Sequence, residues 1–429
     1  MKIKRKGLLR QTAVFVAVII SLVFALTFLF LPKRNMAYAE SGELKVHFVN
    51  VGQGDCCIIE FPDGKLAVID GAEDKKKHED QIQTFIDNNY PDLKYFDYAI
   101  LTHPDSDHCG SLDYILEKYP SRVCYRPNVE AVGTKSNPYE DAGKADLSDE
   151  AVIKETVAYA NAIKAMYATT PDFTSTVYVT DPSVEEQTIT GGSGDDRYVL
   201  NFYSPLSGKY SDWNNYSPIM VLEYRGFKFM LSGDAEKENE KEFVEKVNAA
   251  PTDGVDDKYD VFDDEFCVNV FKAGHHGSRT SSSQGLLDVM TTVAGAPSVY
   301  YIFSCDPVGN KYGHPHQEVI DRLSAMGVPD TNMLRTDYLG DISFTVKLDG
   351  DGYRLFYSTK NGDGGSQNEI PKDEEAPEES IIEKYWLYIV IAVVVIIIII
   401  AVYLYIKKKN AKKGKGKSGS KRGGSKGRR

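Results

Sequence analysis

Short apolar or alternating runs separated by turn residues fill the stretch that follows residue 43. Residues 44–51 (LKVHFVNV), 56–61 (CCIIEF) and 66–72 (LAVIDGA) are separated by the segments GQGD and PDGK. Runs of about four to eight such residues, bounded by Gly, Pro and Asp, are typical of β-strands joined by tight turns. The pattern therefore predicts a hairpin-rich edge of a β-sheet.

Helical and strand patterns alternate along the residues that follow. A helix is expected at 79–88 and another at 111–119, with strands at 96–102 and 122–127. Residues 128–196 are polar apart from a helical segment near 151–167, which suggests an inserted or lid-like excursion. Later elements are expected at 197–205, 219–226, 227–235 and 267–278 (strands) and at 236–247 (a charged helix). This alternation indicates the α/β class.

The N-terminus has the composition of a membrane-targeting segment. A basic start (MKIKRKGLLR) precedes an uncharged apolar stretch at 12–31, and Ala37-Tyr38-Ala39 has the small-x-small form that a signal peptidase accepts. We predict a signal peptide over residues 1–39. Because the apolar stretch is long for a signal peptide, an uncleaved N-terminal anchor is the alternative.

A second apolar segment lies near the C-terminus. Residues 385–406 are 22 residues without a charge, and the 12 Lys and Arg residues within 407–429 have no acidic neighbour. Residues 385–406 are therefore predicted to form a transmembrane helix, and residues 407–429 a basic cytoplasmic tail. The globular domain at 43–357 is then extracellular. Residues 358–384, rich in Gly, Pro and acidic residues, are expected to form a flexible acidic linker to the cell membrane.

The charge is distributed unevenly. The chain has 429 residues and a formal net charge of −12, but residues 40–384 contain 31 basic and 62 acidic residues. An acidic domain disfavours diffuse electrostatic capture of DNA, whereas a basic tail beside a membrane suits contact with lipid headgroups. Six exported cysteines show no CxxC zinc motif, and their spacing matches no small disulfide-stapled module, so the disulfide pairing stays open. Adjacent Cys56 and Cys57 are expected on opposite faces of a strand.

Candidate chemistry is concentrated in the sequence LTHPDSDHCGSL, directly behind an apolar strand. It contains His103, Asp105, Asp107 and His108, four side chains able to bind metal within six residues. This spacing can supply ligands to two neighbouring metal ions. The alternative is a turn followed by a helix N-cap. Asp105 and Asp107 with the intervening serine suffice for that role, so it leaves the histidines unexplained.

Similar residues follow two other predicted strands. Asp234 ends the segment FMLSGDAE, and the adjacent His275 and His276 end VFKAGHHGS. Three such strand-end clusters are improbable by chance, so we expect all three to contribute to one metal site.

Two hydroxyl-rich and imidazole-rich segments lie beyond these candidate ligands. Ser278 and Arg279, within GSRTSSS, and His314 and His316, within KYGHPHQE, are predicted to contact substrate. For the two histidines, the start of a helix is an equally weighted alternative.

Six motifs in order resemble one known family. The segments VHFVNVGQGDCCIIEFPDGKLAVIDGA, LTHPDSDHCGSL, LSGDAE, FKAGHHGSRTSSS, YGHPHQEVIDRL and LRTDYLGDISF are similar to the hydrolase domain of ComEC-type competence proteins, a branch of the metallo-β-lactamase superfamily. The resemblance covers Glu43 to Phe356. It implies an αββα sandwich, with two mixed sheets packed face to face, helices outside, and divalent metal ions at the sheet edge.

The resemblance also implies roles for individual residues. Asp70 would brace the metal loop, Asp234 would bridge the metals, and His275 or His276 would be the late histidine ligand, with His276 preferred. The chain departs from the superfamily pattern HxHxDH at Asp105, and no histidine lies between positions 108 and 275. Ser204 occupies the approximate place of the missing ligand. The expected ligand sets are His103, Asp105 and Asp234 for one ion, and Asp107, His108, His276 and Asp234 for the other.

The expected cofactor is one or two divalent metal ions per chain, with zinc and manganese both open. Oxygen ligands favour Mn²⁺ or Mg²⁺ at the first site, whereas the second suits zinc. Two adjacent cations would activate water and neutralise a phosphoryl oxygen, with Asp107 and Asp234 as the catalytic carboxylates.

The pattern as a whole predicts a membrane-anchored extracellular metal-dependent hydrolase, acting as a phosphodiesterase or a nuclease. A wall polymer, a nucleotide or a phosphocholine ester is an alternative substrate, and a non-catalytic binding or assembly protein is an alternative of another class. Hydrolysis of β-lactams is disfavoured, because it relies on ligands that the chain lacks. One or two membrane segments cannot form a transport channel. No protein partner is predicted.

Overall fold

A computed structural model describes the chain over residues 42–129, 150–184, 187–207, 210–249, 258–259, 261–262, 266–291, 295–307, 311–350, 352–361 and 368–370. These residues belong to one unit, Met1–Pro371. The predicted signal or anchor segment, the transmembrane helix and the basic tail lie outside the described residues. Among the helices that are described, none has the length and apolar character needed to cross a bilayer.

The first sheet is built around the N-terminal hairpins. Its strands run in the order β16 (Asn368–Ile370), β15 (Gly352–Thr359), β14 (Ile342–Asp349), β1 (Leu44–Phe48), β2 (Cys57–Glu60), β3 (Leu66–Ile69), β4 (Phe96–Ile100), β5 (Ser121–Arg126) and β6 (Thr176–Val179). Strands β1 to β3 are antiparallel as predicted. Their predicted position at a sheet edge is wrong, because β14 pairs with β1 on one side and β4 pairs with β3 on the other.

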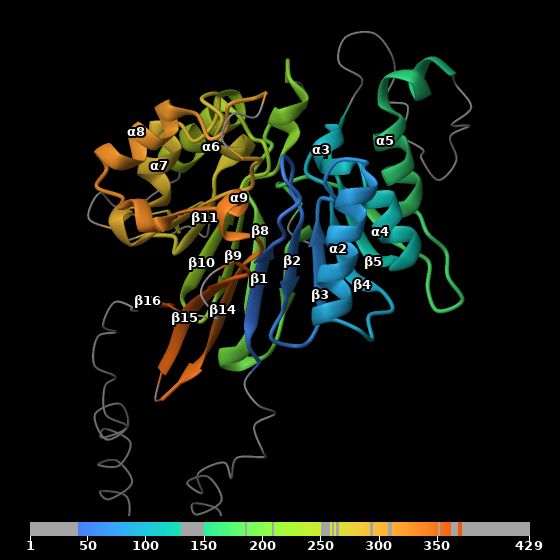
Figure 1. The fold of residues 1–429 in the computed structure, drawn as a ribbon, viewed down its shortest axis with the longest axis horizontal. Helices are drawn as coiled ribbons and strands as arrows, with labels where there is room; N and C mark the ends of the chain where they lie inside the picture. The colour runs from blue at the N-terminus through green and yellow to red at the C-terminus, as the bar shows by residue number, and fades with distance from the viewer. Residues whose placement is uncertain are drawn as a thin grey trace, which may run out of the picture. The chain divides into compact units, whose positions relative to one another are not determined.

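Three helices cover the outer face of this sheet (Figure 1): α2 (Lys76–Asn89), α4 (Leu112–Lys118) and α5 (Glu150–Met166). Buried residues of α5, including Ile163 and Met166, pack in one cluster with Ile115 of α4. Strand β6 then pairs parallel with β5. The predicted lid-like excursion is therefore wrong for residues 150–179, because α5 and β6 follow β5 as a strand–helix–strand crossover within the first sheet. Residues 130–149 lie outside the described residues.

The second sheet contains strands in the order β13 (Met333–Arg335), β12 (Tyr300–Phe303), β11 (Val270–Lys272), β10 (Phe227–Leu231), β9 (Met220–Tyr224), β8 (Tyr198–Phe202) and β7 (Ile189–Gly191). Strands β10 to β13 are parallel. Its outer face packs against α6 (Lys237–Ala249), α7 (Gln284–Met290) and α8 (Gln317–Ala325). Short helices are α3 (Ser106–Cys109), α9 (Thr336–Leu339) and the 3₁₀ turns η2 (Gly194–Asp196), η3 (Trp213–Tyr216), η4 (Gly274–Gly277), η5 (Ala296–Ser298) and η6 (Asp330–Asn332).

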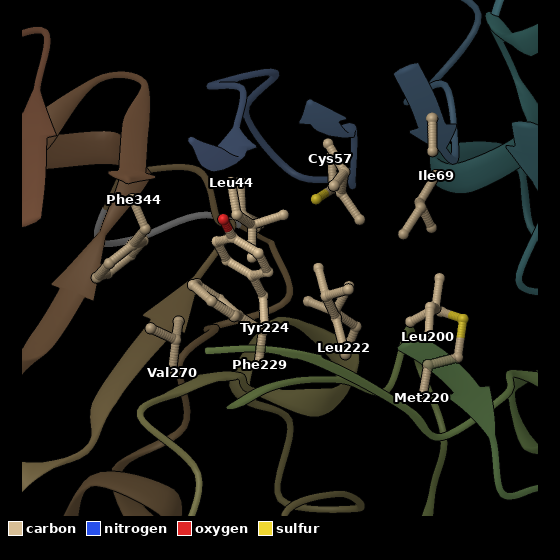
Figure 2. Close-up of a cluster of buried hydrophobic side chains, with 14 of the residues drawn as sticks. Leu44, Cys57, Ile69, Leu200, Met220, Leu222, Tyr224, Phe229, Val270 and Phe344 are labelled. Atoms are coloured by element: carbon tan, nitrogen blue, oxygen red, sulfur yellow. The ribbon is translucent and has the colours of Figure 1, made fainter. Parts of the chain in front are cut away.

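The two sheets pack face to face around an apolar core. Figure 2 shows Leu44 and Ile69 of the first sheet opposite Leu222 and Phe229 of the second. Cys57 lies in this core, whereas Cys56 belongs to the cluster beneath the outer helices, as the alternation of a strand predicts. All six cysteines are free thiols. Helix, sheet, sheet and helix layers together form the predicted αββα sandwich.

The C-terminal boundary of the domain lies later than the sequence suggests. Strand β15 continues to Thr359, where it still pairs with Ile342 of β14. Strand β16 then pairs with β15. The predicted linker at 358–384 therefore begins too early, because acidic and glycine-rich composition does not reveal a strand that completes a sheet edge.

Candidate metal centre

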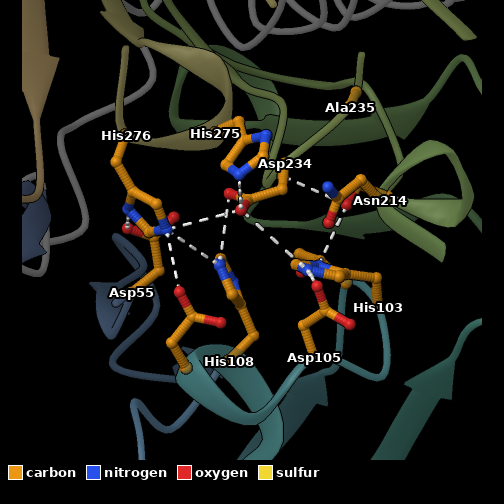
Figure 3. A network of polar contacts seen from close by, with 12 residues as sticks. Asp55, His103, Asp105, His108, Asn214, Asp234, Ala235, His275 and His276 are labelled. Atoms are coloured by element: carbon orange, nitrogen blue, oxygen red, sulfur yellow. Dashed lines mark hydrogen bonds and ion pairs between the residues drawn. The ribbon is translucent and has the colours of Figure 1, made fainter. Parts of the chain in front are cut away.

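The predicted metal-binding residues meet where loops from both sheets converge. The segment after β4 contributes His103 to His108, the segment after β10 contributes Asp234, and the turn after β11 contributes His275 and His276. Figure 3 shows the imidazole rings of His103, His108, His275 and His276 arranged around the Asp234 carboxylate. The structure therefore brings together all three strand-end clusters.

Asp234 is buried at the centre of this group. Its Oδ1 lies 3.2 Å from His108 Nε2. Its Oδ2 lies 3.4 Å from His276 Nε2, 3.7 Å from His275 Nε2 and 4.0 Å from His103 Nε2. A carboxylate approached by ring nitrogens through both oxygens has the placement required of a bridge between two cations.

Two subgroups surround this carboxylate. In the first, His103 Nε2 lies 3.8 Å from Asp105 Oδ2. In the second, His276 Nε2 lies 3.3 Å from His108 Nε2 and 3.4 Å from Asp107 Oδ2. Each subgroup contains residues of one predicted ligand set, and the assignment of the sets to two ions stays a prediction.

The short helix α3 gives the metal loop its shape. It begins at Ser106, with Asp105 at the N-cap position and in extended conformation. Within the described residues, the Asp105 side chain makes no capping hydrogen bond. The helix-cap alternative therefore accounts for the extended backbone conformation of Asp105. It does not account for its carboxylate, which makes no capping hydrogen bond to the described residues.

Asp70, directly after β3, joins this loop to the sheet. Its carboxylate accepts hydrogen bonds from Thr102 N (2.8 Å) and Thr102 Oγ1 (2.8 Å), and from His108 Nδ1 (2.7 Å). These contacts place it where the family resemblance implies a bracing residue. Burial raises the pKa of Asp70, whereas the charge of the neighbouring His108 acts to lower it.

Each of the four imidazoles is held through its Nδ1 atom. The Nδ1–H group of His276 donates to the Ser304 carbonyl (2.8 Å), and that of His108 donates to Asp70. His103 Nδ1 lies 3.0 Å from the Thr102 hydroxyl, which gives its own proton to Asp70 and so can accept one. His275 Nδ1 lies 3.0 Å from Glu236 Oε1. All four Nε2 atoms are thereby left to face the centre.

The electrostatics of the centre depend on burial and on these carboxylates. Burial opposes charge on His108 and His276, but Asp234 and the other nearby carboxylates outweigh it and hold both pKa values well above the usual value. Burial lowers the pKa of His103 to about 3, with the charge of His108 contributing. Burial, together with the charges of Asp107 and Asp234, raises the pKa of Asp105 to about 6.

Asp55 also lies at the centre, although no motif in the sequence marks it as a ligand. Asp55, His108, Asp234 and His276 offer ligand atoms within 4.8 Å of one another. Asp55 Oδ2 also pairs with buried Lys272 Nζ at 2.9 Å. Burial would raise the pKa of Asp55, but Lys272 and His276 hold it well below the usual value. Its segment, the glycine-rich GQGD loop directly behind a strand, has the local pattern of an ordinary turn.

The predicted substrate residues are placed less uniformly. His314 is buried beside the centre, with its ring centroid 5.2 Å from that of His275, and its Nδ1 accepts from Gln53 Nε2 at 3.0 Å. His316 occupies the N-cap position of α8, as its alternative predicts, and its Nδ1 accepts from the Arg279 backbone N–H.

The remaining hydroxyl and guanidinium groups have other partners. Ser278 is buried, with its hydroxyl 2.8 Å from Thr280 Oγ1. The exposed Arg279 side chain lies 3.5 Å from Glu318. The Ser204 hydroxyl, at the approximate place of the missing histidine, accepts from the Ile219 backbone N–H at 2.9 Å. The structure therefore does not bring the side chains of Ser278, Arg279 and Ser204 into the centre.

These residues fit a divalent metal centre. His103 Nε2 is buried and lacks a hydrogen-bond partner among the described residues. A buried polar atom of this kind normally has a partner, and this one faces the Asp234 carboxylate. Imidazole and carboxylate groups are the donors that zinc and manganese accept.

A polar pocket of about 190 Å³ adjoins the second subgroup. Asp107 belongs to its lining, which also contains Gln53, Glu73, Lys75, Ser106, Asp306, Lys311 and Tyr312. Lys75 is paired with Glu73, whereas the Lys311 ammonium lies over the Tyr312 ring, 4.4 Å from its centroid. Asp107 therefore belongs both to the second subgroup and to the lining of this pocket.

Sequence comparison relates the chain to known proteins. Residues 49–196 match the family model described as the metallo-beta-lactamase superfamily, a range that includes Asp70 and the loop from His103 to His108 but ends before Asp234. The chain is 24% identical over 327 residues to ComE operon protein 3 of Bacillus subtilis (strain 168), which covers 72% of this chain. The chain spans about a third (34%) of the length of that relative.

Two solved structures are also similar to the chain. YhfI, a metallo-beta-lactamase fold protein of Bacillus subtilis, matches 66% of this chain and 93% of its own, with 8% identity and a TM-score of 0.33. CmlA, a diiron beta-hydroxylase of Streptomyces venezuelae, matches 72% of this chain and 54% of its own, with 11% identity and a TM-score of 0.37.

Proposed function

We propose that this chain, which carries a metallo-beta-lactamase superfamily domain and resembles ComEC-type proteins, is a membrane-anchored extracellular hydrolase that depends on divalent metal ions. We infer a phosphodiester as its substrate, with nucleic acid as the foremost example. One observation carries the proposal: four imidazole Nε2 atoms from both sheets face the Asp234 carboxylate, with Asp105 and Asp107 beside them.

The residues of the chain have distinct roles in this proposal. His103 and Asp105 would hold one ion, Asp107, His108 and His276 would hold the other, and Asp234 would serve both. When bound, such ions lower the pKa of a coordinated water and offset charge on a phosphoryl oxygen. The Nδ1 contacts described above fix the imidazoles in advance, so little reorganisation is needed on binding.

Asp107 connects the metal centre to the substrate pocket. Its side chain is 27% exposed and lies 3.4 Å from His276, so the same carboxylate belongs to a ligand set and to the pocket lining. Burial would raise its pKa, but the hydrogen bond to His276 and the charges of His108 and His276 hold it well below the usual value. Asp107 therefore stays ionised at neutral pH, as binding a cation and orienting water require.

Positive charge for an anionic substrate would come mainly from the bound ions. Lys75 is paired with Glu73, and Asp107 and Asp306 add carboxylates to the pocket lining, which leaves Lys311 as a further ammonium group. An ammonium group can contact a phosphate oxygen as a point charge. Because the segment 40–384 is acidic overall, with 62 acidic against 31 basic residues, this local contact suits a substrate better than long-range attraction of a polyanion.

The decisive experiment uses the full chain purified in detergent. It is assayed with Mn²⁺, Zn²⁺ and Mg²⁺ against single-stranded DNA, double-stranded DNA and a chromogenic phosphodiester. Asp107→Ala should lower hydrolysis by about 10² or more, because it removes a ligand and part of the charge that fixes water. The fold, stabilised by its two sheets, should survive.

Asp92→Ala provides the matched control, because Asp92 is an exposed aspartate in the turn after α2. It should retain both activity and metal. A folded Asp107→Ala chain with unchanged metal content and unchanged hydrolysis would refute the two-ion proposal. Metal uptake without hydrolysis of any substrate would instead favour the binding or assembly protein.

A further inference from the structure

His275 and His276 adopt a backbone conformation that is rare for two consecutive side-chain-bearing residues. Their φ angles are 48° and 54°, in the left-handed region. That region is disfavoured for residues with a Cβ atom and persists when the surroundings require it. Here the turn directs both rings to one carboxylate, whereas neighbours in a strand would point to opposite faces.

The two rings approach Asp234 from different directions. His276 Nε2 and His275 Nε2 lie 3.4 Å and 3.7 Å from Asp234 Oδ2, and the ring planes are inclined by 73° to each other. Figure 3 shows His275 directly above the Asp234 carboxylate, away from His276. His276 is also in contact with His108 and Asp107, so it belongs to the second subgroup.

The first subgroup lacks a ligand that the second possesses. His103, Asp105 and Asp234 are three protein donors with a single imidazole among them, whereas Asp107, His108, His276 and Asp234 are four. His275 Nε2 and His103 Nε2 both face Asp234 Oδ2, as His276 Nε2 also does. Because His276 already contacts His108 and Asp107, His275 is the imidazole left for the first subgroup. A tetrahedral ion at this position would be completed by one more nitrogen.

Glu236 holds His275 in a form suited to binding metal. Its Oε1 lies 3.0 Å from His275 Nδ1, immediately before helix α6. A carboxylate on the far ring nitrogen is the usual outer contact of a metal-bound histidine, and it leaves the Nε2 lone pair for the metal. Asp70 makes the corresponding contact with His108.

We propose that His275, oriented by Glu236, is the fourth protein ligand of the ion held by His103, Asp105 and Asp234. The paired histidines would then serve different ions, one each, across the shared Asp234 carboxylate. This inference rests on the proposed metal dependence and assigns a second imidazole to the oxygen-rich site. It compensates for the absence of any histidine between positions 108 and 275 in the sequence.

The test measures bound metal in the full chain rather than its activity. Chains loaded with Co²⁺ or Mn²⁺ and then desalted are analysed for metal equivalents, and the Co²⁺ form by its visible absorption. His275→Asn is the main variant, because Asn tolerates positive φ better than most residues and is a poor nitrogen ligand. His276→Asn is its matched partner, and His316→Asn is the control for a nearby histidine.

Wild type should bind about two equivalents and His275→Asn about one, with the absorption band of the remaining ion preserved. His276→Asn should lose the other band, and His316→Asn should keep two equivalents. Glu236→Ala should weaken binding of one ion by about 10- to 100-fold without changing the number bound at saturation. This last variant leaves the His275 side chain and its turn in place.

Two equivalents with unchanged affinities in His275→Asn would overturn the assignment, and so would a single equivalent in wild type. The second outcome would leave a one-ion hydrolase intact, so failure of this inference is distinguishable from failure of the proposed function. Conversely, a wild type that binds two ions and a His275→Asn chain that binds one would support the assignment even if no phosphodiester were hydrolysed.

Discussion

The side chain of Asp105 lies between solvent and His103, with 44% of its surface exposed and its carboxylate 3.8 Å from the imidazole. Asp105→His restores the superfamily pattern in the loop and replaces an oxygen donor by a softer nitrogen. We expect the preference for Zn²⁺ over Mn²⁺ to rise by about tenfold, or about 1.4 kcal/mol. Competition between the two ions, read out by the metal content of the purified chain, measures the shift.

Asp105→Asn is the matched control, because it removes charge without supplying an imidazole. It should weaken binding of both ions and leave their ratio closer to that of wild type. An unchanged ratio in Asp105→His would show that this residue does not bind metal.

Some residues of the centre could be selected from the sequence because histidine is rare and its position behind strands is conspicuous. Asp55 and Glu236 could not be selected in this way. Asp55 follows two glycines and looks like a turn residue, and Glu236 begins a segment, EKENEKE, in which every acid suits a solvated helix. Their roles arise from tertiary contacts, with Lys272 and His275 respectively, that no local pattern encodes.

Helices α6 and α7 are joined by one buried carboxylate. Glu240 of α6 accepts hydrogen bonds from the backbone N–H groups of Ser282 (2.6 Å) and Ser283 (2.8 Å), the latter being the N-cap of α7. Burial raises the pKa of Glu240 from 4.5 to about 7, although these hydrogen bonds oppose the rise. The carboxyl group therefore titrates at a higher pH in the folded chain than in the unfolded chain.

This difference predicts a pH dependence of stability. Between pH 4.5 and about 7 the folded chain retains a proton that the unfolded chain has lost, so the Glu240 contribution falls as the pH rises through this window and is constant above it. Glu240→Gln cannot ionise. The free energy of unfolding of wild type minus that of Glu240→Gln should therefore decrease from pH 4.5 to 7, measured by urea unfolding in the presence of a chelator.

Glu245→Gln, on the same helix with its side chain 66% exposed, should show no such trend. A difference between wild type and Glu240→Gln that is independent of pH would contradict the prediction.

At the scale of elements, the periodicity predicts most strands and helices before residue 279 close to their observed positions, but it gives no bounds for the elements that follow. Helix α4 and strand β10 lie within their predicted ranges, for example. The periodicity could not predict which strands are neighbours. Residues 342–346 pair with residues 44–48, nearly 300 positions earlier in the chain, and this pairing places the N-terminal hairpins in the interior of a sheet. Alternation specifies which side of a strand is buried but not its partner.

At the scale of the whole chain, the proposed membrane anchoring rests on residues 385–406 and the basic tail. Protease added to intact cells should remove the segment before Tyr385 and leave the tail protected, because its 12 uncompensated positive charges favour the cytoplasmic side. An epitope appended to the C-terminus and detected by immunoblot reports the result. Digestion of the epitope in intact cells would refute this orientation, and digestion only after permeabilisation would support it.

Because the candidate ligands come from both sheets, they are synthesised at different times. A ribosome delivers His103 to His108 long before Asp234, His275 and His276, and strand β14 follows all of them before it pairs with β1. A nascent chain that ends within the first sheet thus has only part of either ligand set. Loading with metal would accordingly be a late event, completed after translocation, and ion supply outside the cell rather than in the cytoplasm would decide which metal the mature protein holds.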